Sequence, residues 1–413
     1  MSGNTWYLLL FFVLLFQPLA GRSQTNPWPQ FLGPTRDGVY HGTDLAAQWP
    51  QEGPPVLWQA AAGEGFSGPV VAEGKLILFQ RAGDNEVVEC LNPLTGKSLW
   101  SFPYPTKFRD GIRADNGPRS TPAIADGKVY TYGAEGELHC VDLATGKQIW
   151  HVSGKKEFGV TPRWHGVSTS PLVEGKSVVL VIGSTNSAGI VAFDKETGDV
   201  IWKSTKHKAS CASPVAASID GKRYIFFLSS RSFVAIDPAT GKELFSHPMD
   251  AKHKDHLLAA SPAVSSNLIF TSGAYNVGGH LLKVENGKKQ EVWATPELST
   301  QYATAIPYEG CIYGVHGQWE SGVELRCVDL ATGELRWKQT EFRDATLLRA
   351  GDQFLLTSYA GQLLRATASS KEWKENSRAQ VASFGVRAYP ALADGLMYVR
   401  TKNKLLCLDL RKK

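Results

Sequence analysis

Two stretches of the chain concentrate polar side chains that suit an anionic or planar ligand. The first carries Lys107, Arg109, Asp110, Arg113, Asp115, Asn116 and Arg119, and the second carries Lys155, Lys156, Arg163, Trp164 and His165. Guanidinium groups form forked hydrogen bonds with carboxylates and phosphates, and they also stack on aromatic rings. The alternative is that both stretches are solvated loops that dock on each other through Arg–Asp pairs of small energetic weight.

Common catalytic signatures do not occur in the sequence. It contains no Gly-x-Ser-x-Gly, no His-Glu-x-x-His, no phosphate-binding glycine loop and no Cys-x-x-Cys metal spacing. The net charge of +5 is spread along the chain without a long basic run, which argues against nucleic-acid binding. We therefore expect no catalytic residues, no resident metal and no nucleic-acid partner.

A repeated phrase predicts the elements that position the two polar stretches. Asp142-Leu-Ala-Thr-Gly-Lys-Gln-Ile-Trp150 returns with substitutions along the chain. The close copies occupy 92–100, 194–202, 237–245 and 329–337, and weaker ones occur at 285–293, 367–373 and 409. Their mean step is about 45 residues, the range expected for four-stranded propeller blades. Pairs of short strands around an Asp-Gly or Glu-Gly turn precede the phrase, as at 120–132.

Each part of the phrase has a structural interpretation. The first Asp or Asn can accept backbone N–H bonds inside the turn, and the glycine provides the positive φ that the turn needs. The final aromatic residue opens the fourth strand and can bury a large apolar face between neighbouring blades. We expect this role for Trp58, Trp100, Trp150, Trp202, Phe245, Trp293 and Trp337.

The two ends of the repeat region complement each other. The last unit has three strands, and Pro55-Val-Leu-Trp58 is an unassigned strand that carries a tryptophan. The sequence therefore predicts an all-β chain, an eight-bladed β-propeller of four-stranded antiparallel blades closed by an N-terminal strand. An open solenoid is the alternative. The expected division is a signal peptide at 1–23, an extended lead-in at 24–54 and the propeller at 55–413.

The Thr-Gly-Lys-x-x-Trp pattern resembles the tryptophan-docking repeat of the pyrroloquinoline-quinone-like β-propellers, over roughly residues 55–413. That superfamily includes quinoprotein alcohol dehydrogenases and BamB-type outer-membrane assembly lipoproteins. The resemblance implies the fold, but one fold hosts several functions.

The first 23 residues are expected to direct export. Trp6–Phe16 is apolar but short for a bilayer span, and small residues follow it at 18–23. No cysteine lies near these residues, so the lipid anchor of a BamB-type lipoprotein is not expected. We expect a periplasmic or extracytoplasmic monomer with no transmembrane segment in the mature chain. An uncleaved N-terminal anchor is the alternative.

Aligning the units on the proline of their first strand exposes two rings of equivalent positions. The position three residues before the proline, or before Ala305 and Leu347 in the two units without a proline there, holds Phe66, Arg119, Ser168, Cys211, Ala259, Tyr302, Asp344 and Arg387. The position one residue before it holds Gly68, Thr121, Ser170, Ser213, Ser261, Thr304, Thr346 and Tyr389. Both rings should line or flank the mouth of the axial channel, and the hydroxyl-rich ring reads more readily as structural than as a ligand site.

Two guanidinium groups near a channel mouth need an anion or a carboxylate, and Asp344 can satisfy one of them. The candidate ligand site at this funnel therefore comprises Arg119, Trp164, His165, Tyr302, Asp344 and Arg387.

Three classes of function follow from these observations. The favoured class is an exported, non-catalytic scaffold or protein-interaction module with an unidentified protein partner. The second is a binder of a small anionic or planar ligand, or of a glycan, at the funnel. The third is a dehydrogenase that uses pyrroloquinoline quinone (PQQ) and calcium.

The dehydrogenase class fits the residues least well. The family's alcohol dehydrogenases carry a vicinal cysteine pair and a Glu, Asn and Asp calcium set. Here no two cysteines are adjacent, and Asp115-Asn116 is a weak calcium candidate. Four of the six cysteines lie two residues before an anchor of the phrase, namely Cys90, Cys140, Cys327 and Cys407. We expect them to be buried and free, because equivalent strands of neighbouring blades are too far apart for a disulfide.

Overall fold

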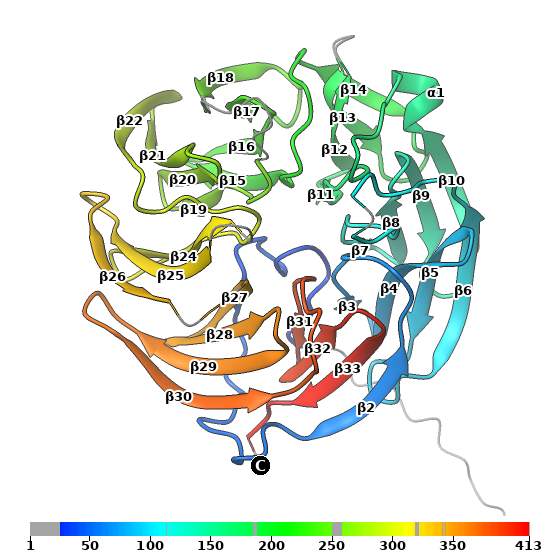
Figure 1. Cartoon of the computed structure of the whole chain (residues 1–413). Coiled ribbons are helices and arrows are strands. Elements are labelled where there is room, and N and C mark those ends of the chain that lie inside the picture. The colour runs from blue at the N-terminus through cyan, green and yellow to red at the C-terminus, as the bar shows by residue number, and fades with distance from the viewer. Residues whose placement is uncertain are drawn as a thin grey trace, which may run out of the picture.

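The computed structural model describes residues 25–112, 114–184, 188–249, 258–318, 322–340, 342 and 344–412. The predicted signal peptide at 1–23 lies outside these residues. Eight sheets surround a central axis (Figure 1), and each is antiparallel apart from the pairing of one added strand. The prediction of an eight-bladed propeller with four-stranded blades is confirmed.

The first four blades follow one another along the chain. Blade 1 contains β3 (Val70–Ala72), β4 (Lys75–Ala82), β5 (Asn85–Leu91) and β6 (Ser98–Pro105). Blade 2 contains β7 (Ala123–Ala125), β8 (Lys128–Tyr132), β9 (Glu137–Asp142) and β10 (Gln148–Ser153), followed by α1 (Gly154–Phe158). Blade 3 contains β11 (Leu172–Glu174), β12 (Ser177–Ser184), β13 (Ala188–Asp194) and β14 (Val200–Ser204). Blade 4 contains β15 (Val215–Ile219), β16 (Lys222–Leu228), β17 (Ser232–Ile236) and β18 (Glu243–Pro248).

The other four blades complete the ring. Blade 5 contains β19 (Ala263–Ser265), β20 (Leu268–Gly273), β21 (Gly278–Glu285) and β22 (Lys288–Thr295). Blade 6 contains β23 (Ile306–Tyr308), β24 (Cys311–Gln318), β25 (Gly322–Asp329) and β26 (Leu335–Gln339). Blade 7 contains β27 (Ala345–Ala350), β28 (Gln353–Ser358), β29 (Gln362–Ala368) and β30 (Trp373–Gln380). Blade 8 contains β31 (Ala391–Ala393), β32 (Leu396–Arg400), β33 (Lys404–Asp409) and β2 (Val56–Ala61).

The N-terminal strand closes the ring as the sequence predicted. β2 is the outer strand of blade 8 and pairs antiparallel with β33, with Trp58 opposite Cys407. The last blade therefore combines three strands from the end of the chain with one from its beginning, and no outer strand is missing from it.

Six phrase tryptophans donate a hydrogen bond to the next blade, namely Trp58, Trp100, Trp150, Trp202, Trp293 and Trp337. The indole N–H of Trp150 donates to the carbonyl of Lys195 at 3.1 Å, and Trp202 donates in the same way to Pro238 at 2.9 Å. Five of these rings lie on the phrase glycine of the next blade, namely Trp58, Trp100, Trp150, Trp202 and Trp293, and a Cβ added to Gly198 would meet Trp150 at 2.8 Å. That glycine has a φ of 80°, so both its positive φ and the approach of the ring require glycine.

Most residues of the hydroxyl-rich ring form a relay of hydrogen bonds from blade to blade around the channel. The backbone N–H of Thr121 donates to the hydroxyl of Ser170, and the N–H of Ser170 donates to the hydroxyl of Ser213, both at 2.9 Å. The relay continues across later blades and ends where the N–H of Thr304 donates to the hydroxyl of Tyr389 at 2.7 Å. Its hydroxyls therefore hold neighbouring blades together, which is a structural role.

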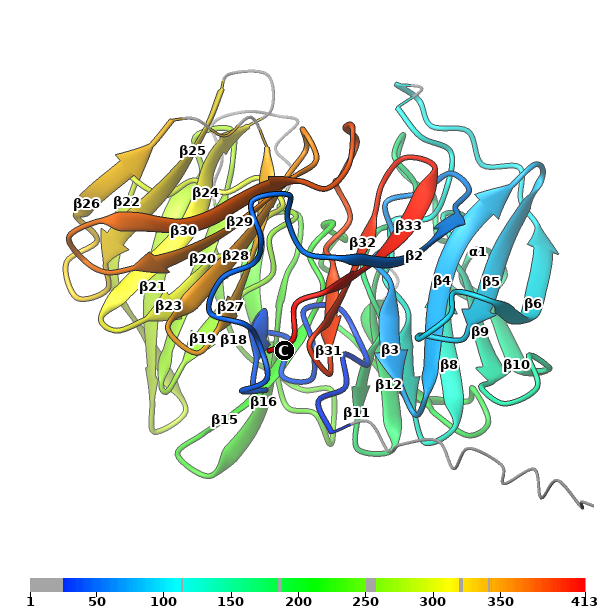
Figure 2. The ribbon, with the colours of Figure 1, turned by 90° about the horizontal axis from the view of Figure 1, so that it is seen from below.

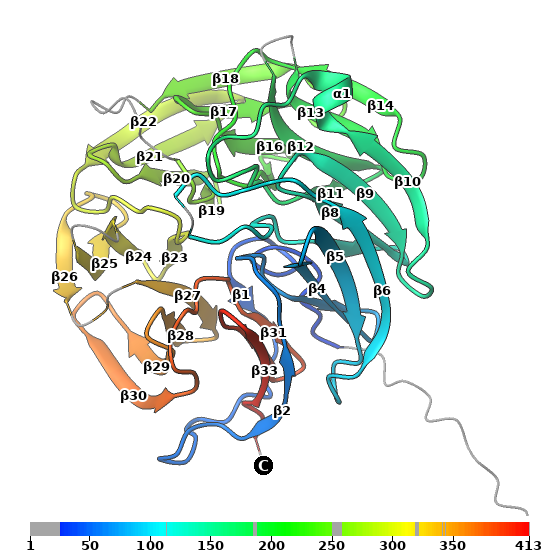
Figure 3. The same cartoon turned by 45° about the vertical axis from the view of Figure 1, so that its right-hand side comes forward.

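The lead-in folds back into one end of the ring. Trp28 is buried and bridges Val71 of β3, and β1 (Val39–Tyr40) adds to blade 7 parallel to β27 (Figure 3). Arg36, on the same segment, donates to the carbonyl of Pro171 at 2.8 Å. Figure 2 shows this dark-blue segment beside the C-terminus, away from the long connections between blades. One end of the channel is thus covered by the chain itself.

The four equivalent cysteines are buried in the third strands of their blades. Burial, the largest cause, raises the pKa of the Cys90 thiol to about 11 and that of the Cys140 thiol to about 12. We predict that thiol titration of the denatured, non-reduced protein will find all four free. A Cys90–Cys140 disulfide detected by mass spectrometry would contradict the spacing of the blades.

The part of the chain that the structure describes holds no helix long and apolar enough to cross a membrane.

Candidate functional site

Arg119 and Arg387 meet at the mouth of the channel, at the start of the first strands of blades 2 and 8. Their guanidinium carbons lie 5.3 Å and 5.5 Å from the centroid of the Phe66 ring. These three residues occupy equivalent positions of successive blades, eight, one and two, which explains why they converge. Aligning the repeat units of the sequence placed Phe66 in the same ring of positions, but Phe66 was not included in the predicted ligand site.

Arg119 is held by groups of this chain. It donates to Asp110 Oδ2 at 2.9 Å and to the carbonyl of His165 at 2.7 Å. Burial alone would raise the pKa of Asp110, but N–H donors from Ile112 and Asp115 and the Arg119 guanidinium outweigh it and lower that pKa. The Asp110 carboxylate is therefore a fixed, ionised partner for Arg119.

Arg387 also faces a carboxylate and an aromatic ring. Its Nε lies 3.8 Å from Asp344 Oδ2, and its guanidinium carbon lies 5.2 Å from the Tyr359 ring centroid. Burial raises the pKa of Asp344, while the Tyr302 hydroxyl and Arg387 lower it, and the net shift is upward. The two arginines thus face two carboxylates of the chain, and this group carries no surplus of positive charge when both carboxyls are ionised.

His165 lies beside a thiol at the same mouth. Its Nε2 is 3.4 Å from Cys211 Sγ, and the Trp164 ring meets it edge-on with centroids 4.7 Å apart. Burial and the charges of Arg119 and Arg163 lower the pKa of His165 to about 4, and burial raises the pKa of Cys211 to about 11. At neutral pH the pair is therefore an uncharged imidazole and an uncharged thiol, the opposite of an activated cysteine nucleophile.

The shifted pKa of His165 predicts acid sensitivity. A histidine with an ordinary pKa near 6.5 in the unfolded chain and about 4 in the folded protein binds more protons when unfolded. The free energy of unfolding should therefore fall as pH drops below about 6.5, by about 1–2 kcal/mol per such histidine at pH 5. In urea unfolding at pH 7 and pH 5, His165→Gln should show a smaller pH difference than the wild type. An equal difference in both proteins would contradict the assignment.

Three exposed apolar side chains lie on the same face as this mouth. Trp164, Ile112 and Phe384 are 50%, 64% and 53% exposed. Each belongs to a connection from the fourth strand of one blade to the first strand of the next, so all three lie on the face where Arg119 and Arg387 meet. The sequence analysis named Trp164 but missed Ile112 and Phe384. Their place in these connections was the available signal.

Comparisons with known proteins give two groups of relatives. A family model described as outer membrane protein assembly factor BamB matches residues 84–339. BamB of Shewanella oneidensis is 23% identical over 385 residues, which cover 86% of this chain and 88% of that protein. Quinoprotein ethanol dehydrogenase of Pseudomonas aeruginosa is 24% identical over 351 residues, which cover 76% of this chain and 54% of that protein.

The chain spans from a third to about half of the length of the first dehydrogenases it matches. It covers 33% of the quinoprotein alcohol dehydrogenase PedH of Pseudomonas putida, at 23% identity over 48% of this chain. The crystal structure of BamB from Moraxella catarrhalis matches with a TM-score of 0.60 and 15% identity, over 90% of this chain and 98% of that one. The crystal structure of quinohemoprotein alcohol dehydrogenase from Comamonas testosteroni matches with a TM-score of 0.68 and 15% identity, over 95% of this chain and 82% of that one. At these identities the structural matches show the fold alone.

Proposed function

This chain belongs to the family of the outer membrane protein assembly factor BamB, and on that premise we propose that it is an exported, non-catalytic scaffold. In this proposal it binds a protein partner through the loops around the open mouth of its channel. The expected signal peptide at 1–23 supports export to the periplasm or another extracytoplasmic space. The partner need not be the one that BamB proteins bind.

The observation that carries this proposal is the apolar exposure of Trp164, Ile112 and Phe384. Large aromatic side chains supply most of the binding energy at protein interfaces, especially when polar groups surround them. Here the surrounding arginines already face carboxylates of the chain, so the polar rim is formed before a partner arrives. The lead-in covers the opposite end of the channel, so the open mouth of the channel lies on this face.

The test is capture of a partner from the exported protein fraction. The protein carrying Trp164→Ala and Phe384→Ala should retain less than about a tenth of the partner that the wild type captures, because two anchors are lost. Leu94→Ala is the matched control, since Leu94 is 65% exposed and lies in the β5–β6 turn, on the other face. Capture that is unchanged in the double variant, or equally reduced in the control, would contradict the proposal.

Binding of a small anionic or planar ligand is the second candidate function. It is favoured by the stacking of both Arg119 and Arg387 on Phe66, and opposed by the two carboxylates that face them. If such a ligand binds, replacing both arginines with alanine should abolish binding, and the wild-type affinity should fall as salt rises.

The cofactor of the quinoprotein relatives does not fit the residues at this mouth. PQQ is a planar tricarboxylate, so it needs several cations without internal partners, and the described mouth offers Arg119 and Arg387 beside Asp110 and Asp344. Cys211 is adjacent in sequence to no other cysteine. We expect no dye reduction with short alcohols or sugars when PQQ and calcium are added. Turnover that disappears when both arginines are replaced with alanine would support the dehydrogenase class instead.

A further inference from the structure

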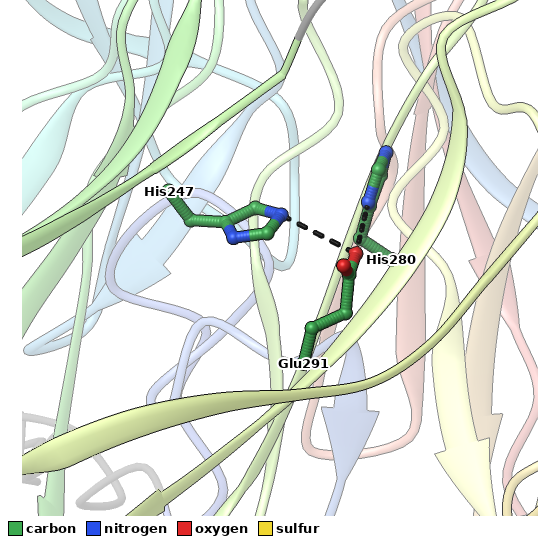
Figure 4. A group of neighbouring side chains, drawn as sticks. All are labelled: His247, His280 and Glu291. Atoms are coloured by element: carbon green, nitrogen blue, oxygen red, sulfur yellow. Dashed lines mark hydrogen bonds and ion pairs between the residues drawn. The ribbon is translucent and has the colours of Figure 1, made fainter.

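Two histidines and a glutamate meet at the seam between blades 4 and 5, away from the channel mouth. His247 comes from β18, His280 from β21 and Glu291 from β22 (Figure 4). Glu291 Oε1 lies 2.7 Å from His280 Nδ1 and 3.3 Å from His247 Nε2. One ligand atom from each residue lies within 4.8 Å of the other two. The Glu291 carboxylate is 40% exposed, which leaves one side of the group open to water.

A β-bulge directs Glu291 toward this seam. In the β21–β22 ladder, Leu281 faces Trp293 and Leu282 faces Glu291, so one extra residue of β22 lies between these pairs. Side chains alternate along a strand, and without the bulge Glu291 would lie on the face of Trp293, toward blade 6. With it, Glu291 shares the face of His280, toward blade 4. The ligand geometry therefore follows from the strand register.

The seam between blades 1 and 2 has the same architecture with different residues. Phe102, His139 and Gln148 occupy the positions of His247, His280 and Glu291 relative to the phrase aromatic. The Phe102 and His139 rings lie 5.4 Å apart at 66°, and those of His247 and His280 lie 5.4 Å apart at 65°. His139 Nδ1 is 3.1 Å from Gln148 Oε1. A blade seam of the same ring geometry therefore forms with Phe102 and Gln148 in the positions of His247 and Glu291.

We propose that the 4–5 seam binds a zinc(II) ion through His247, His280 and Glu291. Two imidazoles and a carboxylate suit zinc, with the fourth tetrahedral position taken by water on the exposed side. Ligand atoms around a tetrahedral zinc ion lie about 3.3 Å apart when the bonds are about 2.0 Å long. The separations of 2.7 Å and 3.3 Å from Glu291 Oε1 lie below or at this value, so small side-chain rotations would complete the site. The ion then links the outer strand of blade 4 to blade 5.

Lys289 provides an independent test of the proposed zinc site. Its Nζ lies 3.3 Å from His247 Nδ1, so a positive charge lies next to one proposed ligand. Metal binding at Nε2 needs the proton on Nδ1, and the lysine must then turn away into solvent. Removing its charge should therefore strengthen zinc binding.

The direct test is calorimetric titration of the tag-free protein with zinc chloride after chelator treatment. We expect one ion per chain and a rise of about 2–5 °C in melting temperature at saturating zinc. His247→Phe and Glu291→Gln reproduce the residues of the 1–2 seam, so they should fold while losing at least about tenfold in zinc affinity. No zinc binding by the wild type, or full binding by both variants, would overturn the proposal.

Two further variants separate this site from other histidines. His151→Ala alters a stacked His139–His151 pair, with ring centroids 4.4 Å apart, and should leave zinc affinity unchanged. Lys289→Gln should tighten binding severalfold. A loss of binding in His151→Ala, or unchanged or weaker binding in Lys289→Gln, would contradict the assigned ligands.

Discussion

Replacing Trp150 with alanine is expected to lower the free energy of unfolding by about 3–5 kcal/mol. Trp150 is 8% exposed, donates its indole N–H to the carbonyl of Lys195 at 3.1 Å and covers Gly198 of the next blade. The substitution removes the apolar contact and leaves a cavity at the seam between blades 2 and 3. Urea denaturation followed by tryptophan fluorescence and circular dichroism measures the change.

Trp150→Phe is the control that separates the two contributions. Phenylalanine keeps much of the buried apolar area but cannot donate to Lys195, so the expected loss is nearer the value of one hydrogen bond, about 1 kcal/mol, plus a smaller packing term. Equal losses in both variants would mean that the hydrogen bond dominates. A melting temperature unchanged in the alanine variant would show that the phrase does not hold the blades together.

The sequence predicted the parts of the fold that repeat. The turn carboxylate of Asp142 accepts the N–H of Thr145 at 2.7 Å, as its place in the phrase indicated. The strand at Val56–Ala61 completes the last blade because the repeat leaves one outer strand unfilled there. Alignment on the strand-one proline was also enough to bring Arg119 and Arg387 into one ring, because equivalent positions in a closed ring share the same radius.

The parts that do not repeat could not be predicted in the same way. The lead-in has no periodic signal, so the burial of Trp28 against β3 and the pairing of β1 with β27 could not be inferred. The pairing of Arg119 with Asp110 depends on the path of a single loop. The His247, His280 and Glu291 group depends on a bulge and on the juxtaposition of two blades, neither of which follows from spacing along one strand.

The balance of charges at the channel mouth bears on which ligands this propeller can bind. An anionic ligand at Arg119 and Arg387 would compete with Asp110, 2.9 Å from Arg119, and with Asp344, 3.8 Å from Arg387. The same two positions with neutral partners would give a cationic funnel on an unchanged propeller. Ligand binding at this mouth would therefore depend on a few loop residues rather than on the blades.

Arg400→Met is expected to lower the free energy of unfolding by about 3–5 kcal/mol, because it leaves buried carbonyl groups without their charged donor. Arg400 is 1% exposed and belongs to β32 of blade 8. It donates to the carbonyls of Ser67 and Phe79 at 2.8 Å and of Gly63 at 3.0 Å. Burial lowers its pKa to about 10, so it remains charged at neutral pH.

The carbonyls of Gly63 and Ser67 lie where the chain crosses from β2 in blade 8 to β3 in blade 1, the seam that closes the ring, and the carbonyl of Phe79 belongs to β4 of blade 1. Arg223→Met is the matched control: Arg223 is 44% exposed, its Nε lies 2.8 Å from Glu174 Oε1, and its loss should cost less than about 1 kcal/mol. Thermal and urea unfolding of both variants measure the difference. Equal, small losses would mean that the ring closes through β2 pairing alone. A much larger loss of unfolding free energy in Arg400→Met would show that the Arg400 guanidinium, through its three carbonyl acceptors, stabilises the seam that closes the ring.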